Sequence, residues 1–530
     1  MVAERMNSDG GNWGDPARSK RPAVAWTAWS YNRCGAGKWS GCWAGSRRRS
    51  YYRSSRADNI TAGEGRAAAS FTRSVCEEWD PVSAIISASS TAVGSMSDPV
   101  RALQHALYRS AKADPGRRFH ALHDKVFRRD VLQRAWVAVR ANNGAPGIDA
   151  TTLADIEEYG VDRFLDELAD DLRNRRWRPL PARRVFIPKP GTAEKRPLSI
   201  PVVRDRIVQA AIKIVLEPIF EADFLPCSFG FRPKRSAHDA LQVLIDQSWQ
   251  GKRWVVETDI ANCFEAIPFD KLIQAVSERV SDQGVLRLVR VMLRAGVMQD
   301  GMVRRPVTGT PQGGVASPLL ANIYLHRVDR AWDEDRHGVL VRYADDAIVM
   351  CDTREQAEAA LARLTALLAD LGLEPKAAKT RIVHLVEGGP GLDFLGFHHR
   401  LVRGRTPRSK HLTFLARWPA RRAVQHARDR IRVITGRSRL LLPPGQIVRE
   451  LNWFLRGWAG YFRYGNSALM LGQIRNYALQ RLAIWLSKRG NQRRAWGWGM
   501  TQILLSPSHL GLVRLDGTVI PPRPFRDWRG

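Results

Sequence analysis

The chain has 530 residues, which is too long for one compact hydrophobic core and predicts two to four domains. Its 83 Lys and Arg against 52 Asp and Glu give a formal net charge of +31, typical of a protein that binds a polyanion, with nucleic acid the first candidate and an anionic membrane surface the alternative. No apolar run approaches the roughly 20 residues that span a bilayer, and the N-terminus lacks the basic-then-apolar order of a signal peptide, so we expect a cytoplasmic protein.

The cysteines and histidines do not form the pattern of a structural metal site. None of the six cysteines belongs to a C-x-x-C pair, and neither His398-His399 nor His120 with His123 has partners at zinc-ligand spacing. Structural zinc and a disulfide framework are therefore not expected.

Residues 1–95 differ in composition from the rest of the chain. They are rich in Trp, Arg, Ser and Gly and follow a period neither of two nor of 3.6, so few packed elements are expected. We interpret them as a low-order extension, either disordered or translated from a misplaced start upstream of Met96, with an RNA-binding arm as the alternative.

From Asp98 onward, apolar residues recur at helical spacing. The pattern predicts one helix within 98–115, a second within 117–143 and, after a Gly/Pro turn, a third amphipathic helix within 144–179 that ends in a basic cluster. Residues 96–180 are thus expected to be helical.

The next segment mixes both kinds of secondary structure. Residues 183–190 and 196–203 are strand-like and separated by a short loop, and residues 204–224 carry apolar side chains at a spacing that predicts a buried helix. The middle of the chain is therefore predicted to be mixed α and β.

The sequence VLVRYADDAIVMC, residues 339–351, carries the strongest chemical signal. Asp345 and Asp346 lie between two β-type apolar runs, which predicts a hairpin with both acids at its bend. Two adjacent carboxylates beside buried strands are costly to desolvate unless a divalent cation neutralises them. The alternative is an exposed turn with two solvated aspartates.

A third aspartate ends another predicted strand. The apolar residues Trp254 to Val256 run into Asp259, and the chain then leaves through a turn and a helix. A two-metal phosphoryl-transfer site needs oxygen ligands from separate strands that converge on ions about 4 Å apart. Asp259 together with Asp345 and Asp346 would supply such a set.

A glycine-rich segment lies between these acids. Gly309, Gly313 and Gly314 form a predicted loop before a helix that begins near Ser317, and such glycines allow the backbone to approach a nucleotide or template strand closely. A purely structural loop is the alternative.

The charge balance shifts after residue 400. Residues 401–440 contain twelve Lys and Arg against the single acid Asp429, which indicates a face that binds nucleic acid. The segment beyond it, read from Val448 to Phe462, is helical and aromatic in pattern, and its aromatic side chains suit either a core or a stacking surface.

Taken in order, these segments resemble the reverse transcriptases of group II introns, also called intron maturases. The resemblance spans residues 142–466 and rests on nine ordered blocks: NNGAPGIDATT, RRVFIPKPGTAEKRPLSIPVVRDRIVQAA, LEPIFEADFLPCSFGFRPKRSAHDAL, DIANCFEAIPF, GTPQGGVASPLLANIYL, RYADD, KTRIVHL, DFLGF and LNWFLRGWAGYFRYGN.

The resemblance implies an α+β fold shaped as a right-hand polymerase, with antiparallel sheet in the fingers and palm, followed by a helical thumb or maturase domain. The implied parts are an N-terminal extension at 1–95, a helical RNA-binding part of the fingers at 96–180, fingers and palm at 181–397, the thumb at 398–475 and a basic, DNA-binding-like region at 476–530.

The resemblance also implies the functional residues. Asp259, Asp345 and Asp346, with the Ile260 carbonyl, match the family's ligands for two magnesium ions, and Phe264 matches the aromatic that blocks a ribose 2′-OH. The implied nucleotide contacts are Lys189, Arg196 and Gln312, and the candidate RNA contacts are Arg421, Arg422, Arg428, Arg430 and Arg432.

The implied function is RNA-directed DNA synthesis on intron RNA, with help in splicing and mobility. The partners would be the group II intron RNA, a DNA target and primer, and deoxynucleoside triphosphates, with nucleoid association and no membrane. The alternatives are a splicing-only maturase and a reverse transcriptase of another lineage, serving defence or diversity generation. The sequence does not indicate an oligomeric state.

Some positions depart from the family pattern. Ser199, Glu265 and Pro268-Phe269 replace commoner residues, but none is a proposed metal ligand, so polymerase activity is expected to survive. The C-terminal residues lack the Cys-pair and His pattern of the endonuclease domain that some relatives carry, so cleavage of a second DNA strand is not expected.

Overall fold

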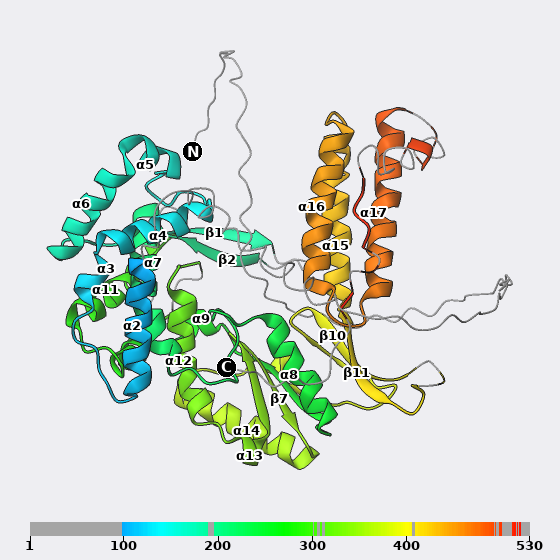
Figure 1. Cartoon of the computed structure of the whole chain (residues 1–530), viewed down its shortest axis with the longest axis horizontal. Coiled ribbons are helices and arrows are strands. Elements are labelled where there is room, and N and C mark those ends of the chain that lie inside the picture. Colours follow the sequence, from blue (N-terminus) through cyan, green and yellow to red (C-terminus); the bar gives the residue numbers. More distant parts are fainter. Residues whose placement is uncertain are drawn as a thin grey trace, which may run out of the picture.

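The computed structural model describes residues 98–188, 195–299, 302–304, 308–309, 313–404, 407, 409–491, 493, 498–500, 511–515, 517 and 519–520. The expected extension at 1–95 and two predicted nucleotide contacts, Lys189 and Gln312, lie outside the described residues. Figure 1 shows the order of the elements along the chain.

The N-terminal helices pack around one long buried helix, α7, which has apolar side chains on nearly all sides. α2 and α4 contact it directly. The elements are α2 (Pro99–Ala113), α3 (His123–Val126), α4 (Arg129–Ala141), α5 (Leu153–Tyr159), α6 (Val161–Arg173) and α7 (Val203–Glu221).

Two of the three helices predicted before residue 180 are each divided in the structure. Residues 117–143 hold α3 and α4, because Arg128 adopts an extended backbone and starts the second helix. Residues 144–179 hold α5 and α6, because Gly160, at φ +100°, ends α5 and turns the chain. The apolar period continues across both breaks, so it did not reveal them.

The central sheet is antiparallel, with strand order β6-β7-β3-β8. Alternate side chains point to opposite faces, and in β3 Val256 packs into a core with α12 and α14 while Val255 packs into a second core with α8 and the C-terminal helices. The strands are β3 (Trp254–Asp259), β6 (Val339–Tyr343), β7 (Asp346–Cys351) and β8 (Arg381–His384).

Helices cover this sheet and complete the middle of the chain (Figure 1). As predicted, one of them begins at Ser317. They are α8 (Ala237–Trp249), α9 (Cys263–Ala266), α10 (Phe269–Ser277), α11 (Gln283–Leu293), α12 (Ser317–Arg330), α13 (Glu334–His337), α14 (Arg354–Asp370) and the 3-10 helix η1 (Ala377–Lys379).

A second sheet, in the order β2-β1-β4-β5, follows the N-terminal helices. β1 and β2 form the predicted antiparallel pair, and β4 joins β1 in parallel. The strands are β1 (Ala182–Pro188), β2 (Lys195–Ile200), β4 (Val297–Gln299) and β5 (Met302–Arg304). The fold is therefore mixed α and β with largely antiparallel sheets, as predicted.

The C-terminal part begins with a third sheet and continues as three packed helices (Figure 1). The sheet order is β11-β10-β9. The elements are β9 (Leu392–Phe394), β10 (Phe397–Arg403), β11 (Thr413–Pro419), α15 (Arg421–Ile434), the 3-10 helix η2 (Arg437–Arg439), α16 (Pro444–Phe462) and α17 (Ala468–Arg489).

Most aromatic side chains of α16 lie in the core. Phe454, Trp458 and Phe462 are buried, whereas Trp453 keeps 69% of its surface exposed. The core interpretation is therefore confirmed for these three side chains, and a stacking role for the exposed Trp453 stays a prediction.

Two expected domain boundaries fall inside single elements. The boundary after residue 397 falls in β10, and the boundary after residue 475 falls in α17, which runs unbroken to Arg489 and packs against α15. A boundary inside a packed helix would divide one hydrophobic core, so the helical unit extends at least to Arg489. Among the helices described, none is both long and apolar enough to cross a membrane.

Candidate active site

The three predicted aspartates lie together at one end of the central sheet. β3 ends at Asp259, β7 begins at Asp346, and these two residues are direct partners in the antiparallel register. Ala344, with φ +58°, and Asp345 form the two-residue turn between β6 and β7. The predicted strand end at Asp259 is confirmed. Of the two acids predicted at the hairpin bend, Asp345 lies in the turn, whereas Asp346 is the first residue of β7.

Backbone hydrogen bonds hold these residues from both sides. The Ile260 N–H donates to the Asp345 carbonyl at 3.3 Å, and the Lys376 N–H donates to the Asp259 carbonyl at 2.7 Å. Ile260 also forms a β-bridge with Pro375. The ends of β3 and the hairpin are thus parts of one hydrogen-bonded frame.

The charge at this end of the sheet is predominantly negative. Burial raises the pKa of the Asp346 carboxyl well above its usual range, and the neighbouring charges of Asp345 and Asp259 raise it further. Burial and Asp259 also raise the pKa of Asp345, against the opposing charges of Lys379 and Arg196. Such a site favours an added cation.

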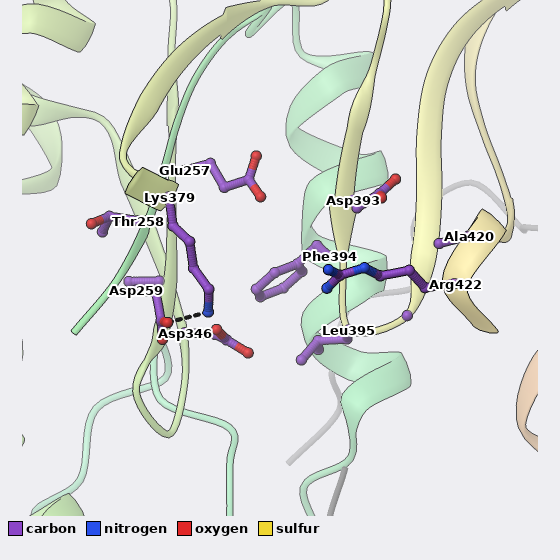
Figure 2. Close-up of a pocket in the computed structure, with 12 residues that line it drawn as sticks. Glu257, Thr258, Asp259, Asp346, Lys379, Asp393, Phe394, Leu395, Ala420 and Arg422 are labelled. Atoms are coloured by element: carbon purple, nitrogen blue, oxygen red, sulfur yellow. Dashed lines mark hydrogen bonds and ion pairs between the residues drawn. The ribbon is translucent and has the colours of Figure 1, made fainter. Parts of the chain in front are cut away.

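Lys379 is a cation already present beside these acids. It ends η1, and its ammonium forms an ion pair with the Asp259 carboxylate, as the dashed line in Figure 2 shows. The KTRIVHL block begins with this residue, but its sequence pattern indicated no role for Lys379. Its position became evident only when η1 was placed against the end of β3.

The donor set suits magnesium by its chemistry, because carboxylate and carbonyl oxygens are the ligands that this hard cation prefers. Among the residues that the structure describes, however, no group of three or more His, Cys, Asp or Glu side chains is already arranged around a metal position. The carboxylate of Asp259 turns to Lys379 instead.

A pocket opens between the central sheet and the start of α15. Arg422 extends from the first turn of α15 toward Phe394 and the acidic residues (Figure 2). The sequence predicted Arg422 as an RNA contact on the basic face, but the structure places it in this pocket. The other lining residues are Glu257, Thr258, Asp259, Asp346, Ala347, Lys379, Asp393, Leu395, Gly396 and Ala420.

Phe264 and Arg196, two further predicted site residues, lie on elements outside the central sheet. Phe264 lies on the short helix α9, five residues after Asp259, and is partly buried against the core. Arg196 lies on β2, and its positive charge acts on the Asp345 carboxylate. The structure thus brings the charge of Arg196 to the acidic site, whereas the role of Phe264 stays a prediction.

The glycine-rich loop connects these two elements. A Cβ on Gly309, at φ +95°, would lie 2.7 Å from the Cα of Glu265 in α9, and a Cβ on Gly313 would lie 2.4 Å from the Ser199 carbonyl oxygen in β2. Thr308 donates its hydroxyl to the Glu265 carbonyl at 3.1 Å. Close backbone approach is therefore the local reason for the glycines.

The remaining predicted RNA contacts lie along α15. Arg421, Arg430 and Arg432 are exposed, and Arg428 is partly buried. Two of these guanidinium groups, those of Arg428 and Arg432, lie 5.7 and 5.8 Å from the ring centre of Tyr477 on α17. Two of the four basic side chains on α15 are therefore positioned by a contact with α17.

Comparison with known families agrees with this arrangement. Residues 187–399 match the model of the family "Reverse transcriptase (RNA-dependent DNA polymerase)". Residues 424–503 match the model of the family "Group II intron, maturase-specific domain". The two matches cover the three aspartates and most of the C-terminal helices.

Individual proteins are also similar in sequence to this chain. Protein YkfC of Escherichia coli (strain K12) is 34% identical over 345 residues, covering 57% of this chain and 88% of YkfC. The group II intron-encoded protein LtrA of Lactococcus lactis subsp. cremoris is 35% identical over 234 residues, covering 44% of this chain and 38% of LtrA.

A fungal relative extends the comparison. The uncharacterized 91 kDa protein in the cob intron of Schizosaccharomyces pombe is 38% identical over 208 residues, covering 39% of this chain and 25% of that protein. The matches to LtrA and to the fungal protein therefore span less than half of each relative. With both family matches and the extended similarity to YkfC, the chain belongs to the group II intron-encoded reverse transcriptases, RNA-directed DNA polymerases that carry a maturase domain.

Proposed function

We propose that this protein copies group II intron RNA into DNA at Asp259, Asp345 and Asp346 and assists splicing of the same RNA through its C-terminal helices. The observation that carries the proposal is the register of the central sheet, in which Asp259 and Asp346 are direct partners and Asp345 is the adjoining turn residue. This arrangement brings carboxylates from two strands to one place.

The three aspartates and the Ile260 carbonyl would hold two magnesium ions. When bound, the ions lower the cost of deprotonating the primer 3′-OH and stabilise the pyrophosphate that leaves the nucleotide. Asp259 would also hold a metal ion, and metal binding would compete with its ion pair to Lys379. The reaction needs no covalent intermediate on the protein.

The surrounding elements correspond to the parts of a right-hand polymerase. The sheet β2-β1-β4-β5 with the N-terminal helices would be the fingers, the sheet β6-β7-β3-β8 the palm, and α15 to α17 the thumb. We assign Arg196, with Lys189 and Gln312, to the nucleotide triphosphate and template. Phe264 would exclude a ribose 2′-OH from its place beside Asp259.

Intron RNA would lie on the basic residues of the thumb. Arg421, Arg428, Arg430 and Arg432 provide positive charge on α15, within or next to the segment that matches the maturase-specific family. The same match favours the intron lineage over a reverse transcriptase that serves defence or diversity generation. A primer and a DNA target would complete the set of partners.

A double variant, Asp345→Ala with Asp346→Ala, tests the polymerase site. It should lose extension of a DNA primer on an RNA template by at least about 100-fold, because the ligands for the reacting groups are gone. Its affinity for intron RNA and its support of splicing at low magnesium should remain, since α15 is unchanged. Full DNA synthesis by the variant would refute the assignment.

A further inference from the structure

A buried arginine lies directly behind the turn that carries Asp345. Arg342 belongs to β6, three residues before Asp345, and its side chain and that of Asp329 in α12 are 3% and 0% exposed. Nε and Nη2 of Arg342 donate to the two carboxylate oxygens of Asp329 at 2.8 and 2.5 Å. The arginine charge is therefore neutralised inside the protein.

The other donors of this guanidinium reach three different parts of the chain. Nη1 donates to the side-chain carbonyl of Asn322 and to the backbone carbonyl of Ala344, each at 3.1 Å, and Nη2 donates to the Ser228 hydroxyl at 2.8 Å. A guanidinium has five N–H donors, and all five have an acceptor here. Asn322 and Asp329 lie seven residues apart on α12 and thus share one face.

The contact with Ala344 fixes the peptide group that precedes Asp345. The Asp345 carbonyl, in the peptide group that follows, accepts the Ile260 N–H at 3.3 Å. Both peptide groups that flank Asp345 are therefore held, one by the Arg342 side chain and the other by the end of β3. The orientation of its carboxylate depends on these two contacts.

A separate loop holds the turn from another side. The Arg342 N–H donates to the Cys227 carbonyl at 2.8 Å, and the Phe229 N–H donates to the Arg342 carbonyl at 2.9 Å. Asn322 donates its amide to the Gly230 carbonyl at 2.7 Å. A Cβ on Gly230 would lie 2.5 Å from the Ala344 nitrogen, so the loop and the turn are in direct contact.

The hydrogen bonds around Arg342 constrain the geometry of the turn more than they add to the stability of the fold. A buried ion pair adds little net stability compared with apolar side chains of the same volume, because both charges must be removed from water. A network in which every donor has a fixed acceptor instead defines one geometry. The acceptor that is closest in sequence to the catalytic acids is the Ala344 carbonyl.

We propose that Arg342 is a positioning residue, which sets the Asp345 carboxylate for metal binding by holding the Ala344 carbonyl between β6 and the loop at residues 227–230. The inference rests on the proposed polymerase function, because it concerns the geometry of the same acids. It adds a requirement beyond the three aspartates themselves: the Arg342 side chain must hold the turn that carries Asp345 in place.

Arg342→Lys tests this directly. Lysine keeps the charge opposite Asp329, but its single nitrogen cannot reach Asp329, Asn322 and Ala344 in the fixed fork geometry of a guanidinium. The half-saturating magnesium concentration for primer extension should rise about tenfold and kcat should fall about 10- to 100-fold, while KM for the nucleotide stays within about twofold. Binding of Mn²⁺ to the protein, followed by electron paramagnetic resonance, should weaken in parallel.

Gly230→Ala tests the position of the turn without altering the buried charges of Arg342 and Asp329. Its added methyl group meets the Ala344 nitrogen, so it should displace the turn and change the metal dependence in the same direction. This variant decides the question if Arg342→Lys does not fold.

Arg279→Lys is the matched control. Arg279 is also a buried arginine, lies 3.3 Å from the Asp223 carboxylate and donates to the Ala111 carbonyl at 2.9 Å, and neither contact involves the hairpin. It should lower the unfolding temperature and leave the magnesium and Mn²⁺ dependence at wild-type values.

The outcomes separate the two hypotheses. If Arg342→Lys and Gly230→Ala lose activity only in proportion to the folded fraction, with wild-type metal affinity, Arg342 serves stability and the inference is wrong. If the wild-type protein itself shows no magnesium-dependent extension, or if the Asp345→Ala, Asp346→Ala double variant extends primers as well as the wild-type protein does, the proposed function fails instead.

Discussion

The three aspartates differ in how their negative charge is compensated. Asp259 forms an ion pair with Lys379, whereas burial and mutual repulsion raise the pKa values of Asp345 and Asp346. The types and spacing of these residues could be predicted from the sequence, because each acid follows or precedes an apolar strand. The compensating residues could not, because Lys379 is 120 residues from Asp259.

The side chain of Phe264 gives a prediction at the residue scale. Phe264→Val should reduce the preference for deoxynucleotides over ribonucleotides by about tenfold or more, because the smaller side chain leaves space for a 2′-OH. Single-nucleotide extension, measured as the ratio of kcat/KM for the two nucleotide types, checks this. Because Phe264 is not a metal ligand, kcat for the deoxynucleotide serves as the internal control, and an unchanged ratio would contradict its assignment.

At the scale of elements, short contacts between loops and strands decide how the site is assembled. The glycine-rich loop touches α9 at Gly309 and β2 at Gly313, which links the two elements that carry Phe264 and Arg196. The sequence predicted that the glycines allow close approach to a nucleotide or template strand, with a purely structural loop as the alternative. The contacts of Gly309 and Gly313 with protein backbone agree with the structural alternative, and an approach to nucleic acid stays a prediction. Which partners they approach became clear only when α9 and β2 were placed on either side of the loop.

Gly309→Ala should weaken nucleotide binding by disturbing that loop. The substitution combines the cost of φ +95° for a residue with a side chain, about 1–2 kcal/mol, with a contact of 2.7 Å to the Glu265 Cα. Steady-state kinetics should show a KM for the nucleotide at least about fivefold higher, which corresponds to about 1 kcal/mol of binding free energy.

Gly251→Ala is the control for this comparison. Gly251 has a similar φ of +103° but no atom within 4 Å of the added Cβ. It should cost stability without changing KM. If both substitutions raised KM equally, the effect of Gly309→Ala would be due to backbone strain and not to the contact with α9.

The strand β10 carries a histidine that makes stability depend on pH. Burial lowers the pKa of His399 to about 3, with the charge of Arg417 adding to the effect, and the side chain is 0% exposed. Because the unfolded chain takes up the proton below about pH 6.5, the neutral folded form contributes its full stability above that pH. The contribution decreases as pH falls from about 6.5 toward 3.

Chemical denaturation at pH 7.5 and pH 5 should therefore differ. At pH 5, about 1.5 pH units below the pKa of histidine in the unfolded chain, His399 should lower the free energy of unfolding by about 2 kcal/mol. His399→Leu should remove that part of the difference, whereas the exposed His120→Leu should leave it unchanged. A difference that persists in full in His399→Leu would assign the effect to other groups.

For the whole molecule, the surplus of positive charge is expected to govern how the protein binds RNA. The basic residues of α15 are spread along one helix, and Arg422 at its start points instead into the acidic pocket (Figure 2). The composition predicted a polyanion partner, and the basic segment after residue 400 predicted where it binds. It did not separate Arg422 from the other arginines, because that depends on which way the first turn of α15 faces.

The dependence of RNA affinity on salt tests this surface. The logarithm of the affinity should fall linearly with the logarithm of the salt concentration, and Arg430→Gln with Arg432→Gln should reduce the slope by about 0.7 to 0.9 for each phosphate that these arginines neutralise. Arg354→Gln on α14, which removes an exposed arginine paired with Glu358, is the control and should leave the slope unchanged. A slope that the α15 variants do not change would place the RNA elsewhere.

The sequence by itself determined the class of fold, the family and the identity of the three acids, because hydrophobic periodicity, strand ends and the order of the blocks are local properties of the chain. It missed the breaks at Arg128 and Gly160, the continuity of α17, and the contacts and surroundings of Lys379, Arg342 and Arg422. The tertiary structure alone decided these, because each depends on a contact between distant segments or on the direction in which an element leaves its neighbour. The site therefore consists of three acids that the sequence identifies and a surrounding frame that only the packed chain defines.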